Sequence, residues 1–173
     1  MRTYIRAKLT GGVYFFTVNL AERSNNDLLI SNIDLLREAF RLTKQHHPFI
    51  IEACVILPEH LHCIWRLPEG DHDFSTRWRL IKTHLSKNMA LNECISNSRK
   101  RKKERGIWQR RFWEHLIKDE EDYKNHLDYI HYNPVKHGYV RRAIDWRYSA
   151  FHLWLEREVY PRDWATKLDM DFG

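Results

Sequence analysis

The stretch FIIEACVILPEHLHCIWRL, residues 49–67, predicts the centre of the fold. Residues 49–57 and 60–67 are both rich in β-branched and aromatic side chains, a composition typical of strands. Only a proline and a glutamate separate them, so we expect the two strands to pair as an antiparallel hairpin. Side chains two positions apart on a strand point to the same face. The second strand therefore carries His60 and His62 side by side on one face.

The sequence on either side of this hairpin alternates between strand and helix patterns. Strand-like and helix-like segments are predicted at residues 13–20 (strand), 31–46 (helix), 73–97 (helix), 111–117 (strand), 119–133 (helix) and 147–158 (helix). The helix over 119–133 is expected to stop there because Pro134 disfavours helical geometry in the residue before it. The order β-α-β-β-α-β-α predicts an α+β fold: a ferredoxin-like or RRM-like antiparallel sheet with helices packed mainly on one face.

Length and composition are those of a single globular domain. The chain has 173 residues and a hydrophobic fraction of 43%, enough for a substantial core. No run of 18 or more apolar residues is present, and the N-terminus lacks the apolar segment of a secretory signal. Cys54, Cys63 and Cys94 form no CxxC pair, a pattern that favours reduced thiols in a cytosolic protein.

Positive charge is concentrated in one segment of the chain. The net charge is +6, and residues 99–111, RKRKKERGIWQRR, hold eight basic residues and one acidic residue. This run lies next to Trp108 and Trp113, whose indole rings could stack on unpaired bases while the cations contact phosphates. A solvated loop beside two core tryptophans explains the same pattern. The basic residues concerned are Arg99, Lys100, Arg101, Lys102, Lys103, Arg105, Arg110 and Arg111.

The paired histidines also allow two interpretations. Two imidazoles on one strand face can chelate a divalent metal, although a strand histidine is more often a hydrogen-bonded core residue. A metal site needs a third ligand, and the helix predicted over 119–133 offers Tyr129 and Asn133 four residues apart on one face. These two residues could equally be a packing aromatic and a helix stop.

Several motifs together resemble one known family. The chain is similar to the single-tyrosine HUH transposases and, among them, to the REP-associated tyrosine transposases of bacteria. The matching stretches are YFFTVNL (14–20), VILPEHLHCIWRLP (55–68), GIWQRRFWEHLIKDEEDY (106–123), YIHYNPVKHG (129–138) and DWRYSAFH (145–152). The resemblance implies a single HUH domain over residues 1–152, followed by a tail over 153–173 whose order the sequence does not predict.

The resemblance also assigns roles to individual residues. It implies that His60, His62 and Asn133 bind Mg²⁺ or Mn²⁺ and that Tyr129 is the nucleophile. Tyr132 is the alternative nucleophile, but the polar residue four positions later would be Lys136, a poor metal ligand. Activity is then expected to fall as the pH drops through the ordinary histidine pKa of about 6.5, because ligation needs neutral imidazoles.

The implied function is metal-dependent cleavage and strand transfer of single-stranded DNA. The substrate would be hairpin DNA from repetitive extragenic palindromes, and the intermediate a 5′-phosphotyrosine, so that no nucleotide cofactor is needed. DNA would be gripped by the basic run and Lys136. The family further implies a bacterial cytoplasmic, nucleoid-associated protein that acts as a monomer without a membrane partner.

Other functions remain open from the sequence. A non-catalytic single-stranded nucleic-acid-binding or regulatory protein on an RRM-like sheet explains the charge and the aromatics, but leaves the paired histidines without a role. A rolling-circle replication initiator shares the HUH chemistry but often carries further domains. A domesticated transposase that acts as a regulator is the third alternative.

Overall fold

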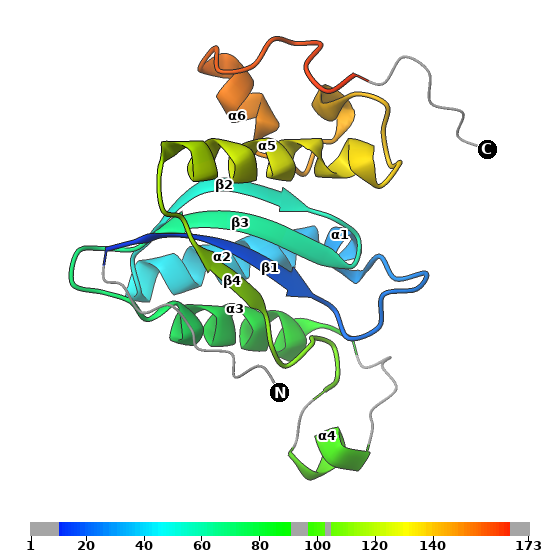
Figure 1. Ribbon diagram of the computed structural model, residues 1–173. Helices are drawn as coiled ribbons and strands as arrows, with labels where there is room; N and C mark the ends of the chain where they lie inside the picture. The colour runs from blue at the N-terminus through cyan, green and yellow to red at the C-terminus, as the bar shows by residue number, and fades with distance from the viewer. Residues whose placement is uncertain (1–10, 91–96, 103–104, 167–173) are drawn as a thin grey trace, which may run out of the picture.

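The computed structural model describes residues 11–90, 97–102 and 105–166, and its centre is a four-stranded antiparallel sheet (Figure 1). The strands lie in the order β2-β3-β1-β4, the order of a ferredoxin-like fold, which confirms the predicted fold class. Their bounds are β1, Val13–Asn19; β2, Ile50–Ile56; β3, His60–Arg66; and β4, Trp113–Leu116.

The β2–β3 hairpin forms as the sequence predicted. Leu57 N–H donates to the His60 carbonyl at 2.9 Å, which closes the turn between the strands. β3 then pairs with β1 on its other side, so that His62 lies opposite Thr17 of β1 and Val55 of β2. Thr17 in turn lies opposite Trp113 of β4. Because residues directly opposite in antiparallel strands share a face, these four side chains form one row across the sheet.

Two helices, α3 and α5, begin at aspartates whose side chains cap them. The Asp73 side chain accepts from Thr76 N–H at 3.0 Å, and the Asp119 side chain accepts from Asp122 N–H at 2.8 Å. The helices are α1, Leu28–Ser31; α2, Ile33–His46; α3, Phe74–Asn88; α4, Asn97–Arg101; α5, Glu120–Lys136; and α6, Phe151–Glu156, with a 3₁₀ turn η1 at Ala143–Asp145.

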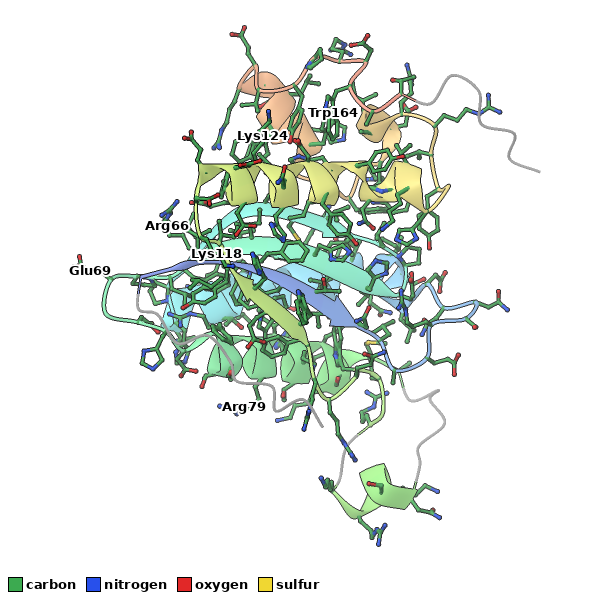
Figure 2. The ribbon with its side chains drawn as sticks, viewed as in Figure 1. Arg66, Glu69, Arg79, Lys118, Lys124 and Trp164 are labelled. Atoms are coloured by element: carbon green, nitrogen blue, oxygen red, sulfur yellow. The ribbon has the colours of Figure 1, made fainter. Side chains whose placement is uncertain are left out.

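Helices cover both faces of the sheet, so the expectation that they pack mainly on one face is wrong. Figure 1 shows α2 and α3 on one side and α5 on the other, with α6 beyond α5. Leu61, Cys63 and Trp65 belong to the core on the α2–α3 side, whereas Ile64 packs with α5. The physical reason is that β3 is buried from His60 to Trp65, so both faces require a cover. In Figure 2, Arg79 on α3 and Trp164 beyond α5 mark opposite outer sides.

The helix that carries the candidate nucleophile continues past Pro134. α5 ends at Lys136, three residues later than predicted. Proline inside a helix removes one backbone hydrogen bond, and here it does so only in the last turn, which keeps the loss small. The helix still closes its last turn, because His137 N–H donates to the Asn133 carbonyl at 3.0 Å. Asn133 is therefore a helical residue with a defined direction relative to Tyr129.

The segment after residue 152 packs against the fold at least as far as residue 166. Residue 152 lies inside α6, so the predicted domain boundary does not coincide with the end of an element. Tyr160 Oη donates to Asp128 Oδ1 of α5 at 2.7 Å, and the Trp164 ring stacks on Phe151 with 5.8 Å between centroids. Within the described ranges, no helix combines the length and apolar character needed to cross a membrane.

Candidate active site and metal centre

His60 and His62 lie on the sheet face that α5 covers, with 4.9 Å between their ring centroids. Each imidazole is held through Nδ1. His60 Nδ1 donates to Glu59 Oε1 at 2.7 Å, and His62 Nδ1 shares a hydrogen bond with Thr17 Oγ1 at 2.8 Å. Metal-binding histidines are commonly oriented in this way, with one ring nitrogen hydrogen-bonded and the other presented to the ion. In this arrangement Nε2 is the atom that each of the two residues can offer to an ion.

Glu59 is the residue that fixes His60, and the sequence analysis assigned it only to the turn. Besides His60, it accepts from Arg23 at 3.1 Å and from Tyr139 Oη at 3.4 Å. Burial raises the pKa of this carboxyl, but His60 and the hydrogen bonds from Arg23 and His60 outweigh burial and leave the pKa lowered. Glu59 is therefore an ionised anchor behind the first histidine.

Burial keeps both histidines neutral. Burial, helped by the nearby His60, His137 and Lys136, lowers the pKa of His62 to about 3. The pKa of His60 is also lowered, again chiefly by burial, although Glu59 acts in the opposite direction. Neutral imidazole is the form that ligates a metal. His62 therefore stays in the form that can bind a metal well below the ordinary histidine pKa of about 6.5.

One face of α5 lies directly over the two histidines. The Tyr129 ring is 5.2 Å from that of His62, and the His137 ring is 5.3 Å from that of His60. Asn133 lies between Tyr129 and His137 at four-residue spacings, which places it on the same helical face. The predicted residues of the strand and of the helix are thus brought together although His62 and Tyr129 are 67 positions apart in the chain.

The buried polar atoms at this position fit a bound cation. His62 Nε2 and both amide atoms of Asn133 are buried without a hydrogen-bond partner among the described residues. An unsatisfied buried polar group costs about 1–3 kcal/mol, so such atoms need a partner. Two imidazole nitrogens and an amide oxygen form a donor set suited to Mn²⁺ or Mg²⁺.

Tyr129 is accessible from solvent at this site. Its side chain is 36% exposed, and Lys136 Nζ lies 4.9 Å from the centroid of its ring. Tyr132 packs half-buried against the apolar cluster on the α5 side of the sheet. By contrast, Tyr129 contacts the His62 ring, and His137, the residue directly after α5, contacts the His60 ring.

The predicted basic residues divide into three groups. Lys136 is at the site itself. Arg105 donates to the carbonyls of Ser86, Met89 and Ala90 at the C-terminal end of α3, so it serves as a helix cap rather than as part of an open surface. The exposed residues are Lys100, Arg101, Lys102, Arg110 and Arg111. Lys103 and the side chain of Arg99 lie outside the described residues.

The two tryptophans beside the basic run have different environments. Trp108 is 6% exposed and its Nε1–H donates to the Lys82 carbonyl at 3.2 Å, so it is a core residue and the stacking role is wrong for it. Trp113 is 54% exposed and shares a cross-strand row with Thr17 and His62. Of these two indoles, that of Trp113 is the one exposed to solvent near the site.

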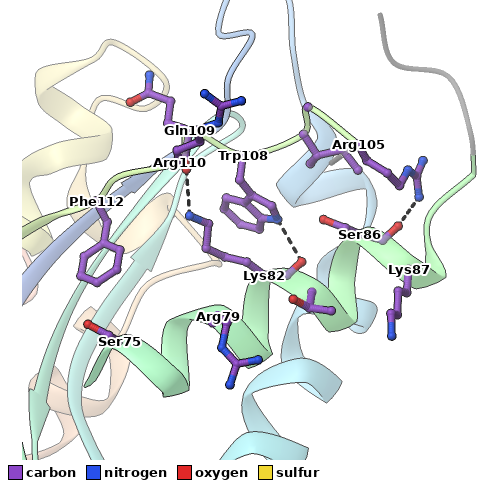
Figure 3. Close-up of a pocket in the computed structure, with 13 residues that line it drawn as sticks. Ser75, Arg79, Lys82, Ser86, Lys87, Arg105, Trp108, Gln109, Arg110 and Phe112 are labelled. Atoms are coloured by element: carbon purple, nitrogen blue, oxygen red, sulfur yellow. Dashed lines mark hydrogen bonds between the residues drawn. The ribbon is translucent and has the colours of Figure 1, made fainter. Parts of the chain in front are cut away.

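A basic groove between α3 and the segment leading into β4 was not predicted (Figure 3). It has a volume of about 580 Å³, and its cationic lining residues are Arg79, Lys82, Lys87, Arg105 and Arg110. Arg79, Lys82 and Ser86 recur at helical spacing on α3. That polar stripe is a sequence signal for this surface, although it is weaker than the denser basic run after residue 98.

Comparison with known proteins places the chain in a family. No family model matches it. Over 165 residues it is 47% identical to the REP-associated tyrosine transposase of Escherichia coli K12, covering 95% of this chain and 92% of that protein. The chain belongs to the REP-associated tyrosine transposase family. A Haemophilus influenzae protein assigned to the same family is 45% identical over 172 residues, covering 98% of this chain and 97% of that protein.

A solved structure supports the assignment to the REP-associated tyrosine transposases. A member of the family bound to a REP hairpin has a TM-score of 0.81 and 45% sequence identity, covering 100% of this chain and 97% of that chain. The predicted family and the predicted enzyme class, a transposase with a tyrosine nucleophile, are confirmed by these relatives. The family, together with a cluster of His115, Asp122 and His126 elsewhere on the sheet, indicates a divalent metal.

Proposed function

We propose that this protein cuts and rejoins single-stranded DNA beside hairpins of repetitive extragenic palindromes, with Tyr129 as the nucleophile. One observation carries the proposal: the exposed Tyr129 ring lies against His62. Asn133 is on the same face of α5 as Tyr129. The solved family member bound to a REP hairpin supports the choice of substrate.

The proposed reaction exchanges one phosphodiester for another. Tyr129 Oη attacks the scissile phosphorus, the bond from phosphorus to the 3′ oxygen breaks, and that strand leaves with a free 3′-OH. The other strand remains on the enzyme as a 5′-phosphotyrosine, which a second 3′-OH can attack, so no ATP is consumed. The phenol proton leaves as the bond to phosphorus forms, and the Lys136 ammonium beside the Tyr129 ring is placed to stabilise the negative charge that develops there.

His60, His62 and Asn133 would hold the metal, and Glu59 and Thr17 would orient the two imidazoles. A bound Mg²⁺ or Mn²⁺ would supply Lewis-acid polarisation of the scissile phosphate. Two nitrogen ligands favour Mn²⁺ over Mg²⁺, since imidazole is a softer donor than carboxylate or water. Lys136, next to the nucleophile, offers a further cation for the phosphate.

DNA outside the reacting phosphate would contact the remaining cations. Lys100, Arg101 and Lys102 are exposed on and directly after α4, and the groove of Figure 3 adds Arg79 and Lys87 from α3. The exposed indole of Trp113, on the same row as His62, would stack on an unpaired base next to the cleavage point. The protein would act as a monomer in the bacterial cytoplasm, on the nucleoid.

The covalent intermediate provides the test. The full chain is incubated with a single-stranded DNA hairpin carrying a short flank and with Mn²⁺, and the intact protein mass is measured. Wild type and Tyr132→Phe should gain the mass of the cleaved strand, and Tyr129→Phe should bind the DNA without any adduct.

Two outcomes would contradict the proposal. An adduct that persists in Tyr129→Phe and disappears in Tyr132→Phe would move the nucleophile to Tyr132. DNA binding by wild type without any adduct, in Mn²⁺ or in Mg²⁺, would favour a non-catalytic DNA-binding protein.

A further inference from the structure

A second cluster of metal-ligand side chains joins β4 to the start of α5. His115 Nε2 lies 2.8 Å from Asp122 Oδ2, and His126 Nδ1 lies 3.0 Å from Asp122 Oδ1. One ligand atom from each of the three residues falls within 4.8 Å of the others, and all three side chains are partly exposed. The cluster is therefore compact and can be reached from solvent.

This cluster is separate from the site at His60 and His62. His115 lies opposite Phe15 in the pairing of β1 with β4, and the Phe15 ring lies between the two groups of histidines. The centroid of the Phe15 ring is 4.7 Å from that of His126 and 5.5 Å from that of His62. An aromatic ring of the sheet thus divides one face into two ligand clusters.

The chemistry of the three side chains is that of a transition-metal site. Burial raises the pKa of Asp122, but hydrogen bonds from Lys118 N–H and His115 outweigh burial and leave the pKa lowered, so the group is a carboxylate. The two imidazole rings stack with 4.6 Å between centroids and 19° between planes. Two histidines and one carboxylate are a common ligand set for borderline divalent metals and a poor one for Mg²⁺.

The distances between donor atoms leave room for such an ion after a small adjustment. Tetrahedral Zn²⁺ with bonds of about 2.0 Å separates its ligand atoms by roughly 3.3 Å. The observed separations of 2.8 and 3.0 Å, one to each oxygen of Asp122, need to open only slightly, and the three ligand atoms lie within 4.8 Å of one another. His126 Nδ1 would also leave its hydrogen bond to the Asp122 carbonyl oxygen, now 2.8 Å long.

We propose that His115, Asp122 and His126 form a second divalent-metal site, for Zn²⁺ or a similar borderline cation, which ties α5 to the edge strand β4. The ion would replace the hydrogen-bonding protons between the carboxylate and the two imidazoles, and solvent would complete its coordination. His126 precedes Tyr129 by three residues, so the site would fix the helix that positions the nucleophile. Only this last consequence rests on the proposed function.

Metal titration of the full chain tests the site without DNA. In a His60→Ala/His62→Ala background, which removes the first site, Co²⁺ is titrated and its visible absorption is followed. One equivalent should bind with the bands of a site containing nitrogen ligands, and Zn²⁺ should displace it. In the same background, Asp122→Asn and His115→Gln should weaken binding by at least about 10–100-fold.

A matched control is available on the other side of the molecule. His84 Nε2 lies 3.4 Å from Glu38 Oε2. Among the residues that the structure describes, this histidine–carboxylate pair belongs to no cluster of three metal-ligand side chains. His84→Gln in the same background should leave Co²⁺ binding unchanged. His115→Gln changes only the strand residue, so it separates loss of a ligand from disturbance of α5.

The outcomes are independent of whether Tyr129 is the nucleophile. Absence of stoichiometric Co²⁺ binding in the background chain would show that the cluster is only hydrogen-bonded. Co²⁺ binding in the Asp122→Asn and His115→Gln variants as tight as in the background chain would place the ion elsewhere. Either result would overturn the second site while leaving the adduct experiment unaffected.

Discussion

Asn133 is fully buried, yet neither of its amide atoms has a hydrogen-bond partner among the described residues. A structural asparagine in this environment would be bonded to its surroundings, because an unpaired buried amide is destabilising. The neighbouring His62 Nε2 is in the same condition. At the scale of single residues, these unpaired atoms favour a ligand role for both side chains over a packing role.

Asn133→Leu separates the two roles. We expect DNA cleavage in Mn²⁺ to fall by at least about 100-fold, since losing a direct ligand should cost no less than losing an outer partner. We expect the free energy of unfolding without metal to stay level or to rise by about 1 kcal/mol, since an apolar group replaces an unpaired amide. A nicking assay and urea unfolding measure the two. Cleavage retained alongside a marked loss of stability would make Asn133 a structural residue.

At the scale of elements, α5 carries two groups of functional side chains along the side that faces the sheet. Tyr129 contacts His62 of β3, with Asn133 one turn further along, and Asp122 and His126 lie against His115 of β4. His131 points away from the sheet toward α6, where its ring is 5.7 Å from Phe151 and 5.2 Å from Tyr160. Burial alone lowers the pKa of His131 to about 3. This histidine belongs to the packing of α5 and not to the active site.

His131 should make the protein sensitive to acid. Its folded pKa of about 3 lies below the unfolded value of 6.5, so the unfolded chain binds the extra proton and stability is lost as pH falls from 6.5 toward 3. Between pH 6.5 and 5 the loss is about 2 kcal/mol, and His62 adds a similar slope. Urea unfolding of metal-free protein at pH 7, 6 and 5 measures it.

The variant His131→Leu should lose less stability than wild type over this pH range, by about 2 kcal/mol. His46→Gln, at an exposed histidine of α2, should follow the wild-type curve. Identical pH dependence in wild type and His131→Leu would show that His131 does not carry the effect.

At the scale of the whole molecule, the net charge of +6 is distributed unevenly. Lys136 lies beside Tyr129, the proposed nucleophile, and the cations of α3 line the groove on the α3 side of the sheet. Figure 1 shows α4, with its exposed basic residues, apart from the layered body of the protein. A DNA hairpin longer than the active site could therefore contact cations on more than one side.

DNA affinity should depend steeply on salt. Each phosphate contact on a single strand contributes about −0.7 to the slope of log K against log salt. Replacing Lys100, Arg101 and Lys102 by Gln should therefore reduce the slope by about 2 in fluorescence anisotropy titrations. A control triple on α2 removes the same charge away from this surface: Arg37→Gln, Arg41→Gln and Lys44→Gln. Equal slopes in the two triple variants would mean that net charge, and not the α4 surface, sets the affinity.

Local periodicity made much of this protein readable from its sequence. The hairpin follows from two β-rich runs separated by a short turn, and the common face of His60 and His62 follows from alternation along a strand. The shared face of Tyr129 and Asn133 follows from the helical repeat, even though Pro134 suggested a helix end too early. These features depend on residues within a few positions of one another, which is why the sequence by itself determined them.

Only the tertiary structure decided how those faces meet. It placed α5 over the histidines, paired Thr17 with a residue 45 positions away, and turned Glu59 into the anchor of His60. It buried Trp108, exposed Trp113 and used Arg105 as a helix cap. The cluster of His115, Asp122 and His126 likewise exists only where β4 meets α5. Burial and contact between distant segments depend on the packing of whole elements, which no local pattern of side chains encodes.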